Sequence, residues 1–286
     1  FFDKAKKELK LKNSKLVSFG STRKLNIKVE EDPQVKALVD AGTEYVCIVG
    51  KSSNLHITKA IETDVEEAIK MATDTIEYLK SNGKKVFFDA EHFFDGYKEN
   101  SEVSYKILDA VINEGVDCFI FCDTNGGTLP HEVTEILGEI TKKYDKQKFG
   151  VHFQNDNGCA VPNSMAAVNL GVDHVQGTMN GYGERTGNAD LCTLLPNLTL
   201  KMEHDTVPLE SLEKLTPIAN HIAELVNVAI DSRHPYVGSS AFTHKAGLHA
   251  SGMAKDSSLY EHIDSSKVGN YTRTTVSELA GRASVI

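Results

Sequence analysis

The sequence lacks the features that define a membrane, secreted or nucleic-acid-binding protein. No apolar run reaches the roughly 18 residues of a membrane-spanning helix, and the opening FFDKAKKELK lacks the apolar core of a signal peptide. The net charge of -9 argues against nucleic acid, because phosphate contacts need clustered lysine and arginine. Five cysteines form no C-x-x-C pair and are typical of free thiols in a reducing compartment. We therefore expect a cytoplasmic protein with no membrane and no nucleic-acid partner.

What is present is the composition of a globular protein, with 286 residues of which 40% are hydrophobic and 25% charged. Apolar runs that favour strands alternate with amphipathic stretches that favour helices, a pattern typical of parallel βα units. The predicted strands are Lys15–Phe19, Tyr45–Val49, Lys85–Ala90, Cys118–Cys122, Phe149–Phe153 and His174–Met179. The predicted helices are Pro33–Ala41, Val65–Asn82, Val103–Glu114, Pro130–Tyr144, Ala160–Leu170 and Ala189–Leu195.

Six βα units are too many for a small flavodoxin-like sheet and too few for a closed eightfold barrel. We therefore predict an α/β fold over residues 1–202. If it is a (β/α)8 TIM barrel, it lacks the first strand, the first helix and the second strand here, because the chain opens on a helix with no strand before it. From about Glu203 the alternation stops, and a helix near Leu209–Ile230 precedes the glycine- and histidine-rich YVGSSAFTHKAGLHASGM. Residues 203–286 are predicted to form a linker and a small, mainly helical C-terminal subdomain.

Polar residues at the carboxyl ends of the predicted strands are the candidates for chemistry, because barrel enzymes keep their active sites there. His152, followed by Gln154, suits a divalent cation with mixed nitrogen and oxygen ligands. The alternative for His152 is a hydrogen-bonded histidine at a strand end. Glu91 follows a buried strand, where a carboxylate needs a metal, a proton or a partner. Its alternative is a helix N-cap or a structural salt bridge.

Two glycine-containing loops add further candidates. In CDTNGGTLP, Thr124 follows a strand, although loop-forming residues alone would explain this segment. The glycines of NGYGERTGN have the spacing G-x-G-x-x-x-G, which does not match a dinucleotide-binding turn. Small residues there permit close approach of the backbone to a ligand. The candidates in this loop are Asn180, Gly181, Gly183, Glu184 and Arg185.

The third group lies in a segment with little helical or strand pattern, where titratable residues are more often functional. It contains His244, His249 and Tyr260. The alternative is a surface loop with incidental histidines.

Five motifs, read together, resemble those of the citramalate synthases. They are FGSTRK (19–24), FFDAEHFFDGYK (87–98), CDTNGGTLP (122–130), the run 150–188, and SSAFTHKAGLHASGM (239–253). This family belongs to the DRE-TIM metallolyase superfamily, together with the 2-isopropylmalate and homocitrate synthases. The resemblance covers nearly the whole chain. It implies a Claisen condensation of pyruvate with acetyl-CoA that gives (R)-citramalate for isoleucine and branched-chain amino-acid biosynthesis.

The resemblance also implies roles for individual residues. His152, Gln154 and Asn180 would lie at a metal site for Mn²⁺, Mg²⁺ or Zn²⁺. Glu91, His249 and Tyr260 would be catalytic, with His249 favoured for proton transfer because imidazole titrates near neutral pH. The substrate-binding set would be Thr124, Asn180, Gly181, Gly183, Glu184 and Arg185. A homodimer is implied, in which the C-terminal subdomain contributes His249 and Tyr260 to the neighbouring site.

The chain departs from the family pattern in two places. The first-strand motif, with its aspartate ligand and its arginine, has no counterpart, and Gln154 stands where the family has the second histidine of His-x-His. We therefore expect this chain alone to bind metal weakly and to be inactive or nearly so. Two alternatives stay open: a 2-isopropylmalate or homocitrate synthase, and a non-catalytic homologue that acts as a dimer partner.

Overall fold

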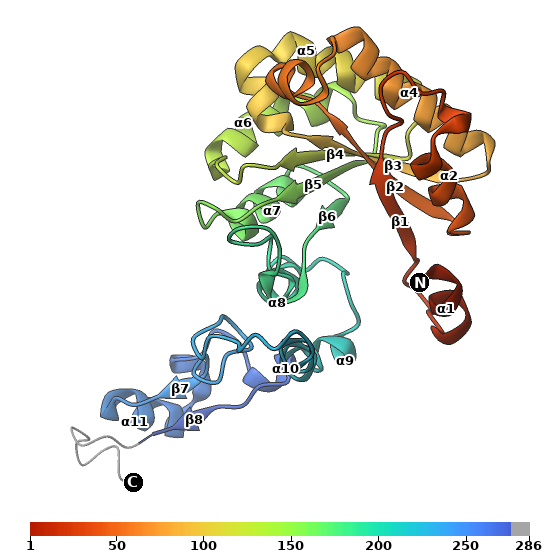
Figure 1. The fold of residues 1–286 in the computed structure, drawn as a ribbon. Coiled ribbons are helices and arrows are strands. Elements are labelled where there is room, and N and C mark those ends of the chain that lie inside the picture. The colour runs from red at the N-terminus through yellow and green to blue at the C-terminus, as the bar shows by residue number, and fades with distance from the viewer. Residues whose placement is uncertain (276–286) are drawn as a thin grey trace. The chain divides into compact units, whose positions relative to one another are not determined.

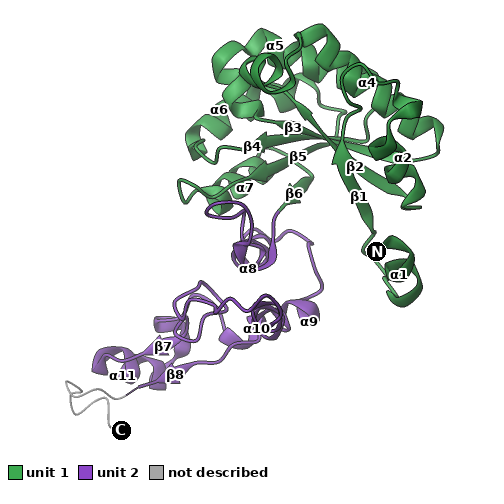
Figure 2. Ribbon diagram, viewed as in Figure 1, with its two compact units in different colours: residues 1–176 green, residues 177–286 purple. Residues whose placement is uncertain are grey.

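The computed structural model describes residues 1–275, which fall into two compact units (Figures 1 and 2). Unit 1 comprises Phe1–Gln176, and unit 2 begins at Gly177. The domain boundary expected after Met202 differs from this division, and it stays a prediction. Residues 276–286 of the predicted C-terminal subdomain lie outside the described residues. Among residues 1–275, none of the helices combines the length and apolar composition that a membrane crossing requires.

Unit 1 is built on one sheet in which all strands are parallel and the strand order follows the chain order. The strands are β1 (Val17–Ser21), β2 (Tyr45–Lys51), β3 (Lys85–Glu91), β4 (Cys118–Asp123), β5 (Phe149–Phe153) and β6 (His174–Gln176). Figure 1 shows the connecting helices on the outer side of the curved sheet: α2 (Pro33–Asp40), α4 (Val65–Ser81), α5 (Phe93–Asn113), α6 (Pro130–Lys143) and α7 (Ala160–Asn169). The predicted α/β fold with six parallel strands is confirmed.

The two faces of the sheet differ because successive side chains of a strand point to opposite sides. On the outer face, Phe119, Phe121 and Val151 are fully buried beneath the helices. The ring of Phe93, from α5, packs edge-on against Phe121 with 4.7 Å between centroids. Full burial of one such side chain is worth roughly 1.5–3 kcal/mol, so this apolar layer is a main source of stability. The inner face instead carries polar side chains at the carboxyl ends of the strands.

Local signals place several helix starts correctly. Asp32 accepts hydrogen bonds from the N–H groups of Gln34 and Val35 and so caps α2. Pro130 occupies the first turn of α6, as predicted. Helix α5, however, starts at Phe93, well before the predicted Val103, and it has a kink at Asn100. The early turns were missed because the chain passes from β3 into the helix through His92, whose φ of 60° gives no N-cap signal in the sequence.

Unit 2 is mainly helical, as predicted. It contains α8 (Leu191–Pro196), α9 (Leu209–Leu212), α10 (Leu215–Val226), α11 (Gly247–Lys255) and a two-stranded sheet of β7 (Thr243–His244) and β8 (Arg273–Thr274). The helix predicted near Leu209–Ile230 is two helices, and Asn227 ends the second in a left-handed conformation. The core of unit 2 consists of Cys192, Leu212, Leu215, Ala219, Tyr236, Val237, Phe242 and Val268.

Candidate active site

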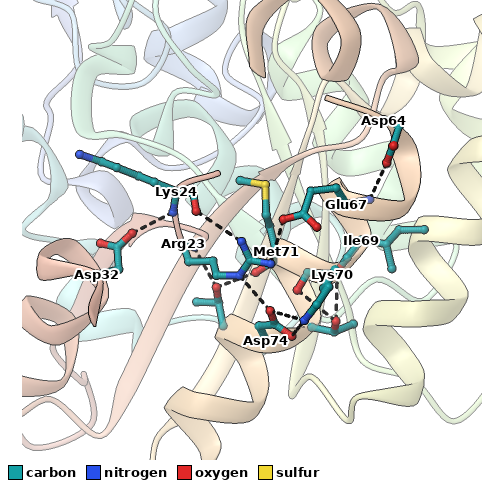
Figure 3. Close-up of polar contacts among 11 residues, drawn as sticks. Arg23, Lys24, Asp32, Asp64, Glu67, Ile69, Lys70, Met71 and Asp74 are labelled. Atoms are coloured by element: carbon teal, nitrogen blue, oxygen red, sulfur yellow. Dashed lines mark hydrogen bonds and ion pairs between the residues drawn. The ribbon is translucent and has the colours of Figure 1, made fainter. Parts of the chain in front are cut away.

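The motif FGSTRK contains a buried arginine, Arg23, that joins the loop after β1 to α4. Arg23 donates through Nε to Asp74 at 2.9 Å and through Nη2 to Glu67 at 3.0 Å (Figure 3). Its main-chain N–H donates to the hydroxyl of Thr75. Its side chain is only 6% exposed. Lys70, on the surface of α4, also contacts Asp74. Through these contacts the guanidinium holds the loop after β1 against α4.

Glu91, the last residue of β3, forms an ion pair with Lys51, the last residue of β2. Both side chains are about one quarter exposed. The main-chain oxygen of Glu91 accepts hydrogen bonds from the N–H and the hydroxyl of Ser52. The carboxylate is thus compensated by a lysine, as in the salt-bridge alternative, and its catalytic role stays a prediction.

Thr124 joins the loop after β4 to the end of β3. Its hydroxyl oxygen accepts a hydrogen bond of 2.9 Å from the N–H of His92. The His92 ring stacks on His56 with 3.5 Å between centroids. Next to Thr124, both carboxylate oxygens of the buried Asp123 accept hydrogen bonds from Thr128, and burial raises the pKa of Asp123. The CDTNGGTLP loop is therefore held by its own polar residues, and Thr124 stands at its junction with β3.

A chain of hydrogen bonds crosses the inner face of the sheet. The carboxylate oxygen Oδ1 of Asp89 accepts from the thiol of Cys47 at 3.1 Å and from Nε2 of Gln176 at 3.0 Å. The other end of the same amide, Oε1, lies 2.8 Å from Nδ1 of His152. Burial raises the pKa of the Asp89 carboxyl and holds that of the Cys47 thiol well above its usual value.

Sequence reasoning missed Asp89, Cys47 and Gln176. The signal that was available is the alternation of β3, which puts Asp89 on the same face as Glu91 within an otherwise apolar strand. A carboxylate buried in such a strand requires partners. Those partners come from β2 and β6, and the sequence does not specify them.

Gln154 follows β5 and lies on the same face as His152, two residues earlier. Its side chain is buried, and its Oε1 has no hydrogen-bond partner among the described residues. An orphaned buried oxygen costs about 1–3 kcal/mol unless something binds it. Together, His152 and Gln154 offer one imidazole nitrogen and one amide oxygen, which are donors that fit a divalent cation. In the described part of the chain, no three His, Cys, Asp or Glu residues are grouped so that they could hold a metal ion.

Asn180 lies in unit 2 and has a left-handed backbone conformation with φ of 60°. Its Nδ2 donates to the main-chain oxygen of Ala219 at 2.9 Å, and its Oδ1 accepts from the thiol of Cys192 at 3.2 Å. The Asn180 amide therefore anchors its loop to α8 and α10. Its expected role in metal and substrate binding stays a prediction.

The rest of this loop depends on glycine. Gly181 and Gly183 both have positive φ, and a Cβ on Gly187 would lie 1.8 Å from the oxygen of Gly181. The loop therefore closes tightly on itself. Glu184 and Arg185 are exposed at its surface.

His249 and Tyr260, far apart in the C-terminal pattern, come together in unit 2. Their rings stack with centroids 4.1 Å apart, and His249 is exposed. His244 pairs instead with Glu261, with 3.2 Å between Nε2 and Oε1. The predicted histidine and tyrosine therefore form one stacked, exposed pair.

Comparison with known proteins agrees with this fold and with the motifs. The HMGL-like family model matches residues 18–221, and the homocitrate synthase post-HMGL domain-like model matches residues 236–286. The chain is 51% identical to the (R)-citramalate synthase of Aquifex aeolicus and 43% identical to that of Geobacter sulfurreducens; each match covers 100% of the chain and 54% of the relative. A probable 2-isopropylmalate synthase of Archaeoglobus fulgidus is 33% identical over 89% of the chain and 49% of that protein.

Solved structures show the same fold at low identity. The HMG-CoA lyase of Bacillus subtilis matches with a TM-score of 0.68 and 19% identity, covering 81% of this chain and 77% of the lyase. The chain spans about half the length of the curated relatives it matches. Because the HMGL-like model matches residues 18–221, more than half of the chain, the chain belongs to the HMGL-like family of the DRE-TIM superfamily.

Proposed function

We propose that the chain is the catalytic part of an acyltransferase that condenses acetyl-CoA with pyruvate, forming (R)-citramalate and releasing CoA. The (R)-citramalate synthases above support this proposal because the identity extends over the whole chain. The structural observation that carries it is the pair of donors at the carboxyl end of β5. There His152 and the unpartnered oxygen of Gln154 lie at the carboxyl end of a strand, where barrel enzymes have their active sites.

A divalent cation, Mn²⁺, Mg²⁺ or Zn²⁺, would polarise the keto and carboxylate oxygens of pyruvate as a Lewis acid. His152 and Gln154 would hold it, and Asn180 is a further candidate ligand. A neutral amide is a poorer ligand than imidazole for first-row transition metals. Weak metal binding by this chain therefore remains our expectation.

The other residues have proposed roles that follow from their chemistry. His249 would accept the methyl proton of acetyl-CoA, and the stacked ring of Tyr260 would orient its imidazole. Glu91, paired with Lys51, would form part of the polar wall around the reacting groups. Thr124 and the loop from Asn180 to Arg185 would bind the substrates.

We also propose a homodimer in which the C-terminal subdomain lends His249 and Tyr260 to the neighbouring site. The support is the surface around the pair, where Leu248 is 75% exposed and Leu259 is 60% exposed. Apolar side chains exposed together are typical of an interface. Light scattering should give a dimer, and Leu248→Glu should shift it toward monomer. A monodisperse wild-type monomer would contradict this part of the proposal.

The function is tested by an assay for CoA release from acetyl-CoA with Mn²⁺ or Mg²⁺. It should be run on this chain, on its Gln154→His variant, and on the full gene product that contains the chain. Pyruvate, 2-oxoisovalerate and 2-oxoglutarate are supplied in separate reactions. We expect pyruvate to be preferred, little activity from the chain alone, and a gain from Gln154→His.

The alternatives have distinct outcomes in the same assay. Preference for 2-oxoisovalerate would identify a 2-isopropylmalate synthase, the second candidate favoured by the Archaeoglobus fulgidus relative. No CoA release with any 2-oxo acid in any form would favour a non-catalytic dimer partner.

A further inference from the structure

The hydrogen-bond chain on the inner face joins strands that are not neighbours in the sheet. Asp89 belongs to β3 and Gln176 to β6, and β4 and β5 lie between them in the strand order. The amide of Gln176 nevertheless reaches Oδ1 of Asp89 at 3.0 Å. This contact is possible because the curvature of the sheet turns the inner-face side chains of β3 and β6 toward one another.

The chain of bonds has a direction that Asp89 determines. Its Oδ1 accepts from both Cys47 and Gln176, and this oxygen remains an acceptor whether or not the other carboxyl oxygen carries a proton. The NH₂ group of Gln176 must therefore point to Asp89. Its carbonyl oxygen then points to His152, 2.8 Å from Nδ1.

An amide oxygen can only accept a hydrogen bond, so Nδ1 of His152 must be the donor. In a neutral imidazole with its proton on Nδ1, the lone pair is on Nε2. No hydrogen bond is formed by Nε2 among the described residues, and the unpartnered oxygen of Gln154 lies on the same face of the strand. The ring is thus held in the form that can bind a cation through Nε2.

We propose that Asp89 and Gln176 are positioning residues that fix His152 in its Nδ1–H tautomer, so that Nε2 is available as a ligand for a divalent cation. This inference rests on the proposed function for the identity of the ligand class. A partner that orients a metal-bound histidine typically contributes about 10- to 100-fold to metal affinity. Asp89 acts at one remove, through the amide of Gln176.

The decisive variant is Asp89→Asn, which keeps the shape of the side chain but makes it both donor and acceptor. The Gln176 amide can then turn over, and His152 is no longer restricted to one tautomer. NMR of the imidazole nitrogens in the metal-free chain should show one Nδ1–H form in the wild type and a mixture in Asp89→Asn. Mn²⁺ affinity, measured by electron paramagnetic resonance, should fall by about 10- to 100-fold.

A double variant that exchanges the carboxylate and the amide between positions 89 and 176 should restore the tautomer and the affinity. In the double variant Asp89→Asn, Gln176→Glu, the carboxylate at 176 again accepts from Nδ1 of His152, and the amide at 89 donates to it. The single tautomer and most of the Mn²⁺ affinity should return. The control is Asn163→Ser, which removes a buried amide that donates to the main-chain oxygen of Thr128 and has no contact with this hydrogen-bond chain. It should change neither readout.

The proposal is overturned if wild-type His152 carries its proton on Nε2, if the wild type binds no Mn²⁺, or if Asp89→Asn changes neither tautomer nor affinity. An equal loss of affinity in Asn163→Ser would also overturn it, because the effect would then be general loosening. Failure of the CoA-release assay with intact tautomer and Mn²⁺ results would refute the proposed function and leave this inference standing.

Discussion

Replacing Arg23 with methionine should destabilise unit 1 by about 2–3 kcal/mol, somewhat less than the roughly 3–5 kcal/mol typical of a broken buried ion pair. The guanidinium is 6% exposed and binds carboxylates of Asp74 and Glu67 on α4. Removing it leaves those charges without their buried partner. We lower the magnitude because the two carboxylates are 25% and 29% exposed and because Asp74 keeps Lys70 at 2.7 Å.

The assay is urea unfolding followed by circular dichroism, with Lys70→Met as the matched control. Lys70 reaches the same carboxylate from the surface, with its side chain 61% exposed. An exposed i,i+4 pair is worth only about 0.3–0.5 kcal/mol. Arg23→Lys should fall between the two, because lysine keeps the charge but loses the fork that binds both carboxylates.

The salt dependence of the two destabilisations is a second test. Added salt should reduce the small Lys70 effect, because screening acts on exposed charges, and should leave most of the Arg23 effect in place. Equal destabilisation by Arg23→Met and Lys70→Met would refute the reasoning. So would an Arg23 effect that disappears at high salt.

Three further predictions concern a helix cap, the thiols and a tight turn. Burial by itself raises the pKa of Asp32, but three main-chain N–H groups outweigh it and lower the pKa on balance. Its cap therefore stabilises the fold above the unfolded-state pKa of about 4, and this contribution is lost as the pH falls through the folded pKa. Asp32→Ala should cost about 1–2 kcal/mol near neutral pH and much less in acid unfolding; an undiminished penalty in acid would contradict this. Among the five cysteines, Cys159 is not buried, whereas burial raises the pKa of Cys118 to about 12. Iodoacetamide should therefore modify Cys159 first, as read by peptide mass spectrometry, and equally fast labelling of Cys118 would count against the structure. Gly187→Ala should lower the melting temperature more than Gly158→Ala, because both have positive φ but only Gly187 would place its Cβ 1.8 Å from a main-chain oxygen; equal shifts would show that the turn is not as tight as described.

Much of unit 1 could be predicted from the sequence because its elements depend on local chemistry. An apolar run such as Cys118–Asp123 favours a strand wherever it is buried, and Pro130 suits the first turn of a helix in any context. The positions of His152 and Glu91 at strand ends follow from the same pattern. The start of α5 at Phe93 was not predictable, because a histidine in the left-handed conformation at 92 leaves no capping signal.

The sequence predicted which residues form the candidate site, but it did not predict which other residues they contact. The motifs identify Gln154 and His249, but only the structure shows the orphaned oxygen of the first and the stacking of the second on Tyr260. The roles of these residues in binding and catalysis stay predictions. Their neighbours come from distant segments, which no local pattern encodes.

The sequence by itself determined the order of strands and helices, since hydrophobic periodicity and turn residues act over a few neighbouring positions. Only the tertiary structure decided which inner-face side chains meet. The curvature of the parallel sheet brings Asp89 to Gln176, and the packing of α4 against β2 and β3 brings Asp74 to Arg23 in the loop after β1. These contacts join residues far apart in the chain. They form because burying a charged or polar group costs free energy unless a partner lies within hydrogen-bond distance, and only the fold supplies that partner.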